Sequence, residues 1–199
     1  MSTKIRKRLS GPERRIRLIQ AAIKVFSGKG YEGASVQEIA RAASVTKPVL
    51  YDHFSSKEEL FVAAIEQIRD GLLQRGNAAV SRESTQGKRL RAAISVFFDL
   101  VENDPSGARV LLISSNAPAS IADICRRIQA AATSGIVQIM RSRSSSGAGD
   151  SERQSILKAE FTKKGMHGLA EWWLEHPDVP RSEIDESLFG ILKRGVGLK

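Results

Sequence analysis

The chain has 199 residues, of which 41% are hydrophobic, so it can bury a sizeable core and is not an intrinsically disordered protein. Its 31 lysines and arginines against 22 aspartates and glutamates give a formal net charge of +9, which indicates an anionic partner such as nucleic acid or an anionic membrane. Cys125 is the single cysteine, which excludes an internal disulfide, a thiolate zinc cluster and a CxxC redox pair.

The positive charge is concentrated in the first third of the chain. Residues 1–60 hold 12 lysines and arginines and 6 acidic residues, a net +6, which leaves +3 for the rest. The basic start, MSTKIRKRLSGPERR, lacks the apolar stretch of a secretory signal, and no run of about 18 apolar residues occurs. We therefore expect a cytoplasmic protein that does not enter a membrane, with its anion-binding surface near the N-terminus.

Helical periodicity dominates the sequence, which predicts an all-α fold of about nine helices. Ser10, Ser35 and Ser56 are each followed three residues later by a glutamate, the pattern in which a serine and a glutamate cap a helix start reciprocally. The first helix is expected over about 11–28 and the second over about 36–43.

Residues 44–54 read SVTKPVLYDHF and predict a short third helix after a tight turn. Thr46 is suited to cap it, and Pro48 is tolerated in the first turn because a helix has no partner for its first N–H groups. Leu50 and Phe54 are four residues apart and face inward with Val45, whereas Lys47, Pro48 and Tyr51 face outward. Two helices joined by such a turn form a helix-turn-helix.

The outward face of the third helix suits a DNA duplex. Lys47 can donate to guanine O6 and N7, and Pro48 with Val49 can pack on a thymine methyl group. Phosphates are the expected targets of four further side chains, and Gln37 could reach a base edge or a phosphate. The four are Thr46, Tyr51, His53 and Lys57.

Residues 14–62, above all SVQEIARAASVTKPVLYDHFSSKEELF, resemble the DNA-binding domain of the TetR/AcrR family of bacterial transcription regulators. The resemblance implies an all-helical homodimer with a basic arm (1–10), a helix-turn-helix domain (11–56) and a ligand-binding and dimerisation domain (57–199). By position it implies DNA contacts for Ser35, Gln37, Thr46, Lys47, Pro48, Tyr51, His53 and Lys57.

Two positions depart from the family pattern. Ser44 occupies the place of a turn glycine, which implies a backbone conformation that serine adopts at some cost. Asp52 puts an acidic group near the phosphates, where it either accepts from a cytosine amino group or points away. The arm KIRKR (4–8) is read either as a backbone or minor-groove contact or as a solvated tail.

Beyond residue 60 the elements are predicted from periodicity. A fourth helix (57–75) would link two domains, followed by a loop (81–88) and a central apolar helix (88–103). Asp104 and Pro105 open a sixth helix, Asn116 and Pro118 start a seventh that runs to about Arg143, and 142–151 has the composition of a loop. The last two helices are expected over about 152–176 and 182–194.

Glycines within the eighth helix favour a closely packed partner helix, because an interior glycine otherwise costs roughly 1 kcal/mol. We expect the last two helices and their symmetry mates to form a four-helix dimer interface. Its predicted residues are Leu157, Phe161, Gly165, Leu169, Trp172, Leu188 and Leu192. A dimer would set two recognition helices about 34–36 Å apart on an imperfect palindrome. The stretch AEWWLEHPDVP also resembles C-terminal domains of the family.

Six residues of the C-terminal half either line a ligand cavity or make a filled core, and the residues alone leave both open. They are Phe97, Val101, Leu111, Cys125, Ile128 and Met140. The family resemblance favours the cavity and implies a small apolar effector that shifts the fourth helix and releases a repressor from its operator.

Three functions compete: a ligand-responsive repressor, a DNA-binding regulator without a small-molecule effector, and an enzyme. No GxSxG, HExxH, phosphate-binding glycine loop or Ser/His/Asp set supports the enzyme. Cys125 is read as a buried core thiol. His167 and His176 are nine residues apart, which does not fit a metal pair on one helical face, so neither a metal nor another cofactor is expected.

Overall fold

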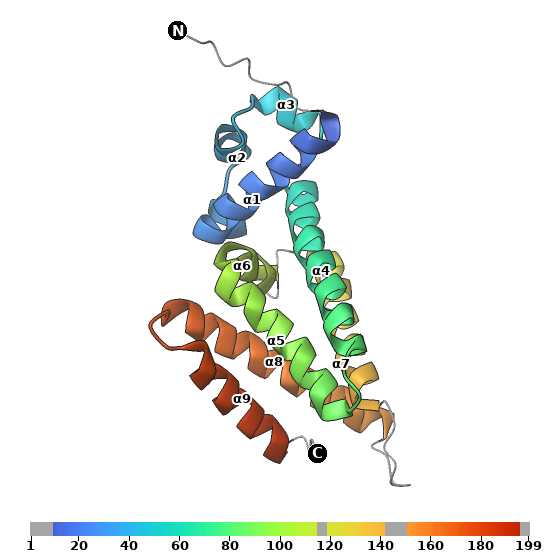
Figure 1. Cartoon of the computed structure of the whole chain (residues 1–199). Coiled ribbons are helices and arrows are strands. Elements are labelled where there is room, and N and C mark those ends of the chain that lie inside the picture. Colours follow the sequence, from blue (N-terminus) through green and yellow to red (C-terminus); the bar gives the residue numbers. More distant parts are fainter. Residues whose placement is uncertain (1–9, 115–118, 142–150, 196–199) are drawn as a thin grey trace.

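The computed structural model describes residues 10–114, 119–141 and 151–195, and the regular elements within these ranges are nine helices. In chain order they are α1 (Gly11–Gly33), α2 (Val36–Ala42), α3 (Lys47–Tyr51), α4 (Lys57–Ser81), α5 (Gln86–Asn103), α6 (Pro105–Ile113), α7 (Ala122–Arg141), α8 (Glu152–Glu175) and α9 (Arg181–Gly195). The all-α prediction is confirmed. Figure 1 shows α1–α3 gathered at one end, here called the head, and α4 running from the head along the larger C-terminal domain.

Reciprocal caps start the first two helices of the head, as predicted. The backbone N–H of Ser10 donates to the Glu13 carboxylate at 2.8 Å, and the N–H of Glu13 donates to the Ser10 hydroxyl oxygen at 3.4 Å. Ser35 and Glu38 repeat the pattern at 3.1 and 3.2 Å. Each cap satisfies N–H groups that a helix start leaves without a partner, which fixes where the chain turns into the helix.

The other two predicted caps differ from the pattern. At α4 the N–H of Glu59 donates to the Ser56 hydroxyl oxygen at 3.1 Å, but the Glu59 carboxylate accepts from the backbone N–H of Ser55 at 2.7 Å. Thr46 occupies the N-cap position of α3, yet its side chain makes no capping hydrogen bond. The cap prediction for Thr46 is therefore right in position and wrong in bonding.

The turn between α2 and α3 depends on Ser44, whose φ is +57°. Its N–H donates to the Arg41 carbonyl at 3.0 Å, and the N–H of Val45 donates to the Ala40 carbonyl at 3.0 Å. This pair of bonds closes a helix C-terminus around one left-handed residue, a position usually taken by glycine. The conformation implied by the serine at this position is confirmed.

Helix lengths differ from the predictions where packing between helices extends them. The α4 helix runs to Ser81 and not to about 75, because its second half packs along α5. The α5 helix accordingly begins at Gln86, inside the predicted loop. The α7 helix begins at Ala122, and the predicted starts at Asn116 and Pro118 lie outside the described residues.

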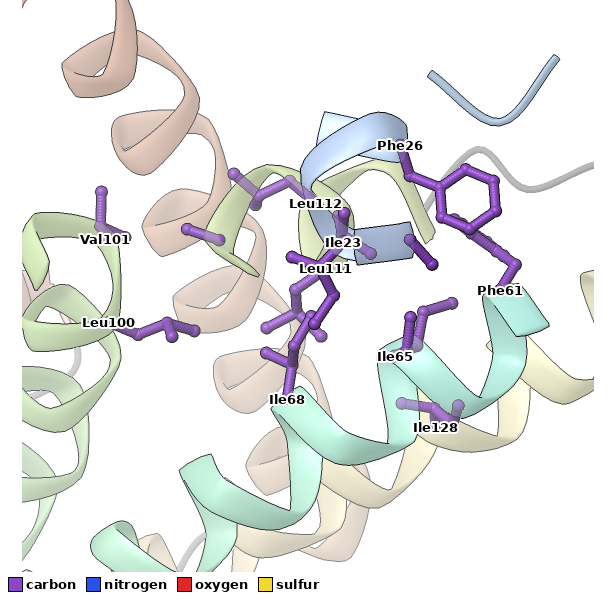
Figure 2. Close-up of a cluster of buried hydrophobic side chains, with 14 of the residues drawn as sticks. Ile23, Phe26, Phe61, Ile65, Ile68, Leu100, Val101, Leu111, Leu112 and Ile128 are labelled. Carbon is purple, nitrogen blue, oxygen red and sulfur yellow. The ribbon is translucent and has the colours of Figure 1, made fainter. Parts of the chain in front are cut away.

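One apolar core joins the head to the C-terminal domain. Phe26 of α1 packs against Phe61 of α4 with ring centroids 4.9 Å apart. Figure 2 shows the continuation of this cluster: Ile23 of α1 lies near Leu111 of α6, and Ile65 of α4 faces the same space. Each of these side chains is at most 8% exposed. The set Ile23, Phe26, Phe61, Ile65, Ile68, Leu111 and Leu112 is called the shared core below.

The C-terminal domain is built around α5, whose buried residues cover most of its circumference. They are Leu90, Ile94, Val96, Phe97, Phe98, Leu100 and Val101. Arg181 fastens the start of α9 to this helix, since its guanidinium donates to the Asp99 carboxylate and the Ser95 carbonyl, both at 3.1 Å. These contacts leave α9 on the outside of α8, where Figure 1 shows the two helices running side by side.

Replacing Ser44 by glycine should stabilise the protein. A left-handed conformation costs an L-residue with a side chain about 1 kcal/mol, so we expect Ser44→Gly to raise the free energy of unfolding by roughly 0.5–1 kcal/mol. Ser134→Gly, within the exposed side of α7, is the matched control and should lower it by roughly 0.5 kcal/mol. Urea unfolding measures both; a loss of stability in Ser44→Gly would contradict the role of this turn.

Candidate nucleic-acid interface and effector cavity

The exposed face of α3 carries the side chains that the sequence assigned to DNA. Leu50 and Phe54 are buried, at 0% and 1% exposure, and hold the helix against the head. Lys47, Pro48 and Tyr51 are exposed, and the Lys47 ammonium lies 5.7 Å from the centroid of the Tyr51 ring. A cation, a proline ring and a phenol are therefore exposed together on one short helix. The helix cannot leave the head without exposing Leu50 and Phe54 to water.

Arg15 of α1 locks the far end of α3 in place. Its guanidinium donates to the His53 carbonyl at 2.6 Å and lies 4.1 Å from the centroid of the Phe54 ring. The pattern of the sequence did not single out Arg15. A hydrogen bond combined with a cation–π contact restrains both the backbone after α3 and its buried anchor.

Lys57 has a different role from the phosphate contact predicted for it. Its ammonium donates to the carbonyls of Tyr31 at 2.9 Å and Ala34 at 3.1 Å, and it lies 4.4 Å from the centroid of the Tyr31 ring. Lys57 is half-buried and ties the start of α4 to the end of α1. Only the fold could reveal this contact, because 26 residues separate Lys57 from Tyr31.

The two predicted residues on α2 are both at the surface. Ser35 is engaged in its cap, where its hydroxyl also donates to Glu38 at 2.9 Å, and Gln37 is exposed in the first turn. Hydrogen bonds from Lys29 and Ser35 lower the pKa of Glu38 to about 2. The Lys29–Glu38 ion pair thus neutralises a carboxylate that would otherwise oppose an anionic ligand.

His53 is half-buried and follows the end of α3. Thr46 is exposed and directly precedes the start of α3. Six of the eight predicted residues, Ser35, Gln37, Thr46, Lys47, Pro48 and Tyr51, are exposed on α2, α3 and the turn between them. Short helices joined by a tight turn, with polar side chains outward at the start of the second, make this head a helix-turn-helix domain.

The comparisons with known proteins agree with that class. Residues 18–64 match the family model described as bacterial regulatory proteins, tetR family. The HTH-type transcriptional activator FasR of Mycolicibacterium smegmatis is 44% identical over 104 residues, which are 52% of this chain and 48% of FasR. The matched part thus spans about half the length of this relative. Over residues 18–64 the chain is thus similar to bacterial regulators of the tetR family.

Solved structures share the fold over almost the whole chain. The transcriptional regulator FadR from Bacillus subtilis, in complex with stearoyl-CoA, has a TM-score of 0.79 at 19% identity and covers 89% of this chain and 96% of its own. A TetR-like transcriptional regulator from Rhodococcus sp. RHA1 also has a TM-score of 0.79, at 22% identity, with 96% and 100% covered. The arrangement of a helix-turn-helix head on a larger helical domain is therefore shared by these proteins.

An apolar cavity of about 140 Å³, partly open to the surface, lies in the C-terminal domain and is lined by side chains of α4, α5, α6, α7 and α8. Of the six residues predicted to line a cavity, Phe97, Leu111 and Ile128 do so. Val101 and Cys125 border other hollows, and Met140 packs against the core as a partly buried residue. These three do not line this cavity, because periodicity finds the buried side of a helix but not which neighbour it faces.

None of the four polar residues of the cavity wall was predicted, and two of them, Lys163 and His167, lie on α8. Their spacing of four, within the buried stripe of α8 that includes Met166 and Ala170, is the signal that could have found them. His167 stacks on Phe97 with ring centroids 5.6 Å apart. Burial, reinforced by the charges of Lys163 and Lys164, lowers the pKa of His167 to about 4, so the imidazole is neutral at pH 7.

The α8 helix has a second apolar stripe that faces away from the core. Of the seven residues predicted for a dimer interface, Leu157, Phe161 and Trp172 are 62%, 64% and 44% exposed, Gly165 is exposed and Leu169 is half-buried. Leu188 and Leu192 of α9 were assigned to the wrong side: they are 6% and 2% exposed and pack inside their own chain. Ile191, at 53% exposure, is on the outer side of α9 and was missed.

Cys125 is buried, as expected of a core thiol, and burial raises its pKa. Within the described ranges, none of the helices has the length and apolar character needed to cross a membrane.

His167 should make stability fall in mild acid. Its pKa of about 4 in the folded state lies below the ordinary value of 6.5, so the unfolded chain binds the proton more readily. The contribution of neutral His167 to the free energy of unfolding is fully present above pH 6.5. It is lost as the pH falls toward 4, by up to about 3 kcal/mol. Urea unfolding at pH 7.5, 6 and 4.5 should show a weaker pH dependence in His167→Gln than in the wild type, with His176→Gln, a half-buried histidine that does not line the cavity, as the control. Equal pH dependence in the wild type and His167→Gln would contradict this.

Proposed function

We propose that this protein is a transcriptional regulator that binds an imperfectly palindromic DNA operator as a homodimer in the cytoplasm. The exposed group of Lys47, Pro48 and Tyr51 on the anchored α3 helix is the observation that carries the proposal. Lys47 is suited to a guanine edge and Pro48 to a thymine methyl group, while Tyr51, Thr46 and His53 are suited to phosphates. Gln37 and Ser35 extend the same surface along α2.

The outer stripe of α8 and α9 supports the homodimer. Leu157, Phe161, Trp172 and Ile191 are each 44% or more exposed, and large apolar side chains gathered on one face of a soluble domain mark an interaction surface. Pairing the same stripe of two copies is the self-complementary contact of a two-fold dimer. Such a dimer presents two copies of α3 to successive major grooves. Two copies are needed because one five-residue helix contacts too few base pairs for useful specificity.

The apolar cavity supports control by a small apolar ligand. At about 140 Å³ it is comparable with engineered apolar cavities of about 150 Å³ that bind benzene. The structurally similar regulator FadR from Bacillus subtilis was solved in complex with stearoyl-CoA. This complex supports an effector site in a domain of this fold.

The connection from the cavity to the head runs through α6 and α4. Leu111 lines the cavity and also belongs to the shared core, where it lies near Ile23 of α1 (Figure 2). A ligand that prefers one arrangement of α4 and α6 would therefore shift the population of head positions. In the proposed mechanism the ligand lowers operator affinity and relieves repression.

A second candidate is an activator with the same DNA-binding surface. It is favoured by the relative FasR, whose name describes a transcriptional activator and which matches this chain over 104 residues. Transcription from a promoter that carries the operator separates the two, because added protein lowers the transcript level for a repressor and raises it for an activator.

The DNA-binding proposal is tested by Lys47→Ala/Tyr51→Ala. An operator selected from random duplexes should bind the wild type at two half-sites, and the double variant should lose at least roughly 30-fold in affinity and relax specificity at the contacted base. Lys88→Ala, an exposed lysine of α5, is the control and should bind like the wild type. Unchanged affinity in the double variant, or a chain that sediments as a monomer at all concentrations, would overturn the proposal.

The effector proposal is tested by filling the cavity. A panel of short alcohols and fatty acids should contain a ligand that raises the melting temperature and weakens operator binding, since saturation at a hundred times Kd adds about 2.7 kcal/mol. Ala93→Phe places a ring in the cavity and should abolish both effects, whereas Ala92→Phe, which is equally half-buried and does not line the cavity, should retain them. If no ligand class gives a response in the wild type, the regulator works without a small-molecule effector.

A further inference from the structure

Lys163 is a buried cation on the inner side of α8. It is 6% exposed, and its ammonium donates to the Thr133 hydroxyl at 2.6 Å, the Glu160 carboxylate at 2.8 Å and the Gln129 carbonyl at 3.3 Å. Its counterion Glu160 has a side chain that is 43% exposed. A buried ion pair generally adds little stability over an apolar side chain of the same size, so stability alone does not account for a lysine here.

The position of Lys163 is more informative than its burial. It lines the apolar cavity, and together with Gln129 it also lines a second, open hollow of about 570 Å³ between α7 and α8. This outer hollow is bordered by Ser114, Ala122, Cys125, Arg126, Gln129, Ala130, Glu160, Lys163 and Lys164. Lys163 thus lies in the wall between an apolar space and a larger space whose lining is more polar.

The charges around this wall favour an anion. The outer hollow is bordered by three cationic side chains and by the single carboxylate of Glu160; one of the three, Arg126, pairs with Asp123 outside the lining. On the cavity side His167 is neutral at pH 7. Arg69, the other cationic group of the cavity, belongs to α4 and pairs with Glu66 and Asp70. Lys163 is therefore the cation next to the junction of the two spaces.

We propose that Lys163 selects an anionic amphiphile as the effector: a short apolar chain fills the cavity, and a carboxylate or phosphate group at its end accepts from the Lys163 ammonium. The anion takes the place of Glu160, whose half-exposed carboxylate turns toward water. The remainder of a larger headgroup occupies the outer hollow beside Lys164. This selection rests on the proposed effector function of the cavity.

Three probes that share a six-carbon chain test the role of the charge: hexanoate, hexyl phosphate and 1-hexanol. The chain length follows from the benzene-sized volume of the cavity. Binding to the full-length protein is measured by calorimetry. In the wild type at least one of the two anions should bind at least about tenfold more tightly than the alcohol, as expected for a hydrogen bond to a charged group. The better of the two anions identifies the headgroup.

Two variants assign that preference to Lys163. Lys163→Met should lower the affinity for the preferred anion by at least about tenfold and leave 1-hexanol within about twofold. Glu160→Gln should raise affinity for the anion several-fold, because it removes the competing carboxylate, again without an effect on the alcohol. Lys88→Met is the control for a distant positive charge and should match the wild type.

The outcomes separate this proposal from the effector function itself. Equal binding of alcohol and anions in the wild type, or an anion preference that survives Lys163→Met, overturns the selection by Lys163 and leaves the cavity as a site for neutral ligands. Binding of none of the three probes contradicts the effector site at this size. If Lys163→Met does not unfold cooperatively, Glu160→Gln decides, and an unchanged anion affinity there overturns the proposal.

Discussion

The position of the DNA-facing surface depends on the burial of the shared core, in which α1, α4 and α6 meet (Figure 2). Phe26 and Phe61 close its end toward the head, and Leu111 closes its end toward the cavity. Packed interiors are as dense as organic crystals, so a change in the cavity cannot be absorbed locally and must move a neighbouring helix. In the proposed mechanism, the same burial that holds the head in place would also make it respond to a ligand in the C-terminal domain.

The head itself is held by a small number of specific contacts. The α3 helix is only five residues long, too short to be stable alone, and depends on buried Leu50 and Phe54 and on Arg15 at its far end. The left-handed conformation of Ser44 sets the direction in which α3 leaves the turn after α2. Rigid support of this kind is what an interface needs if three or four exposed side chains are to meet a groove in fixed geometry.

The α8 helix serves two surfaces at once. Its inner stripe, with Lys163 and Met166, borders the cavity. Its outer stripe, with Leu157, Phe161 and Trp172, is exposed, and we propose that a second copy packs there. A helix that is apolar on two sides cannot satisfy both within one protomer. A ligand that moves the inner side of α8 would thereby also act on the proposed interface between the two copies, and so on the distance between their heads.

The sequence by itself determined the helices of the head, the caps of the first two, the left-handed serine in the turn and the outward set of Lys47, Pro48 and Tyr51. All of these depend on residues at most five apart, so local pattern and capping chemistry specify them. Only the tertiary structure decided that Lys57 binds the carbonyls of α1, that Leu188 and Leu192 face inward, and that Lys163 and His167 reach the cavity. Periodicity shows that a helix has a buried side, but which helix covers that side is decided by packing between segments far apart in the chain.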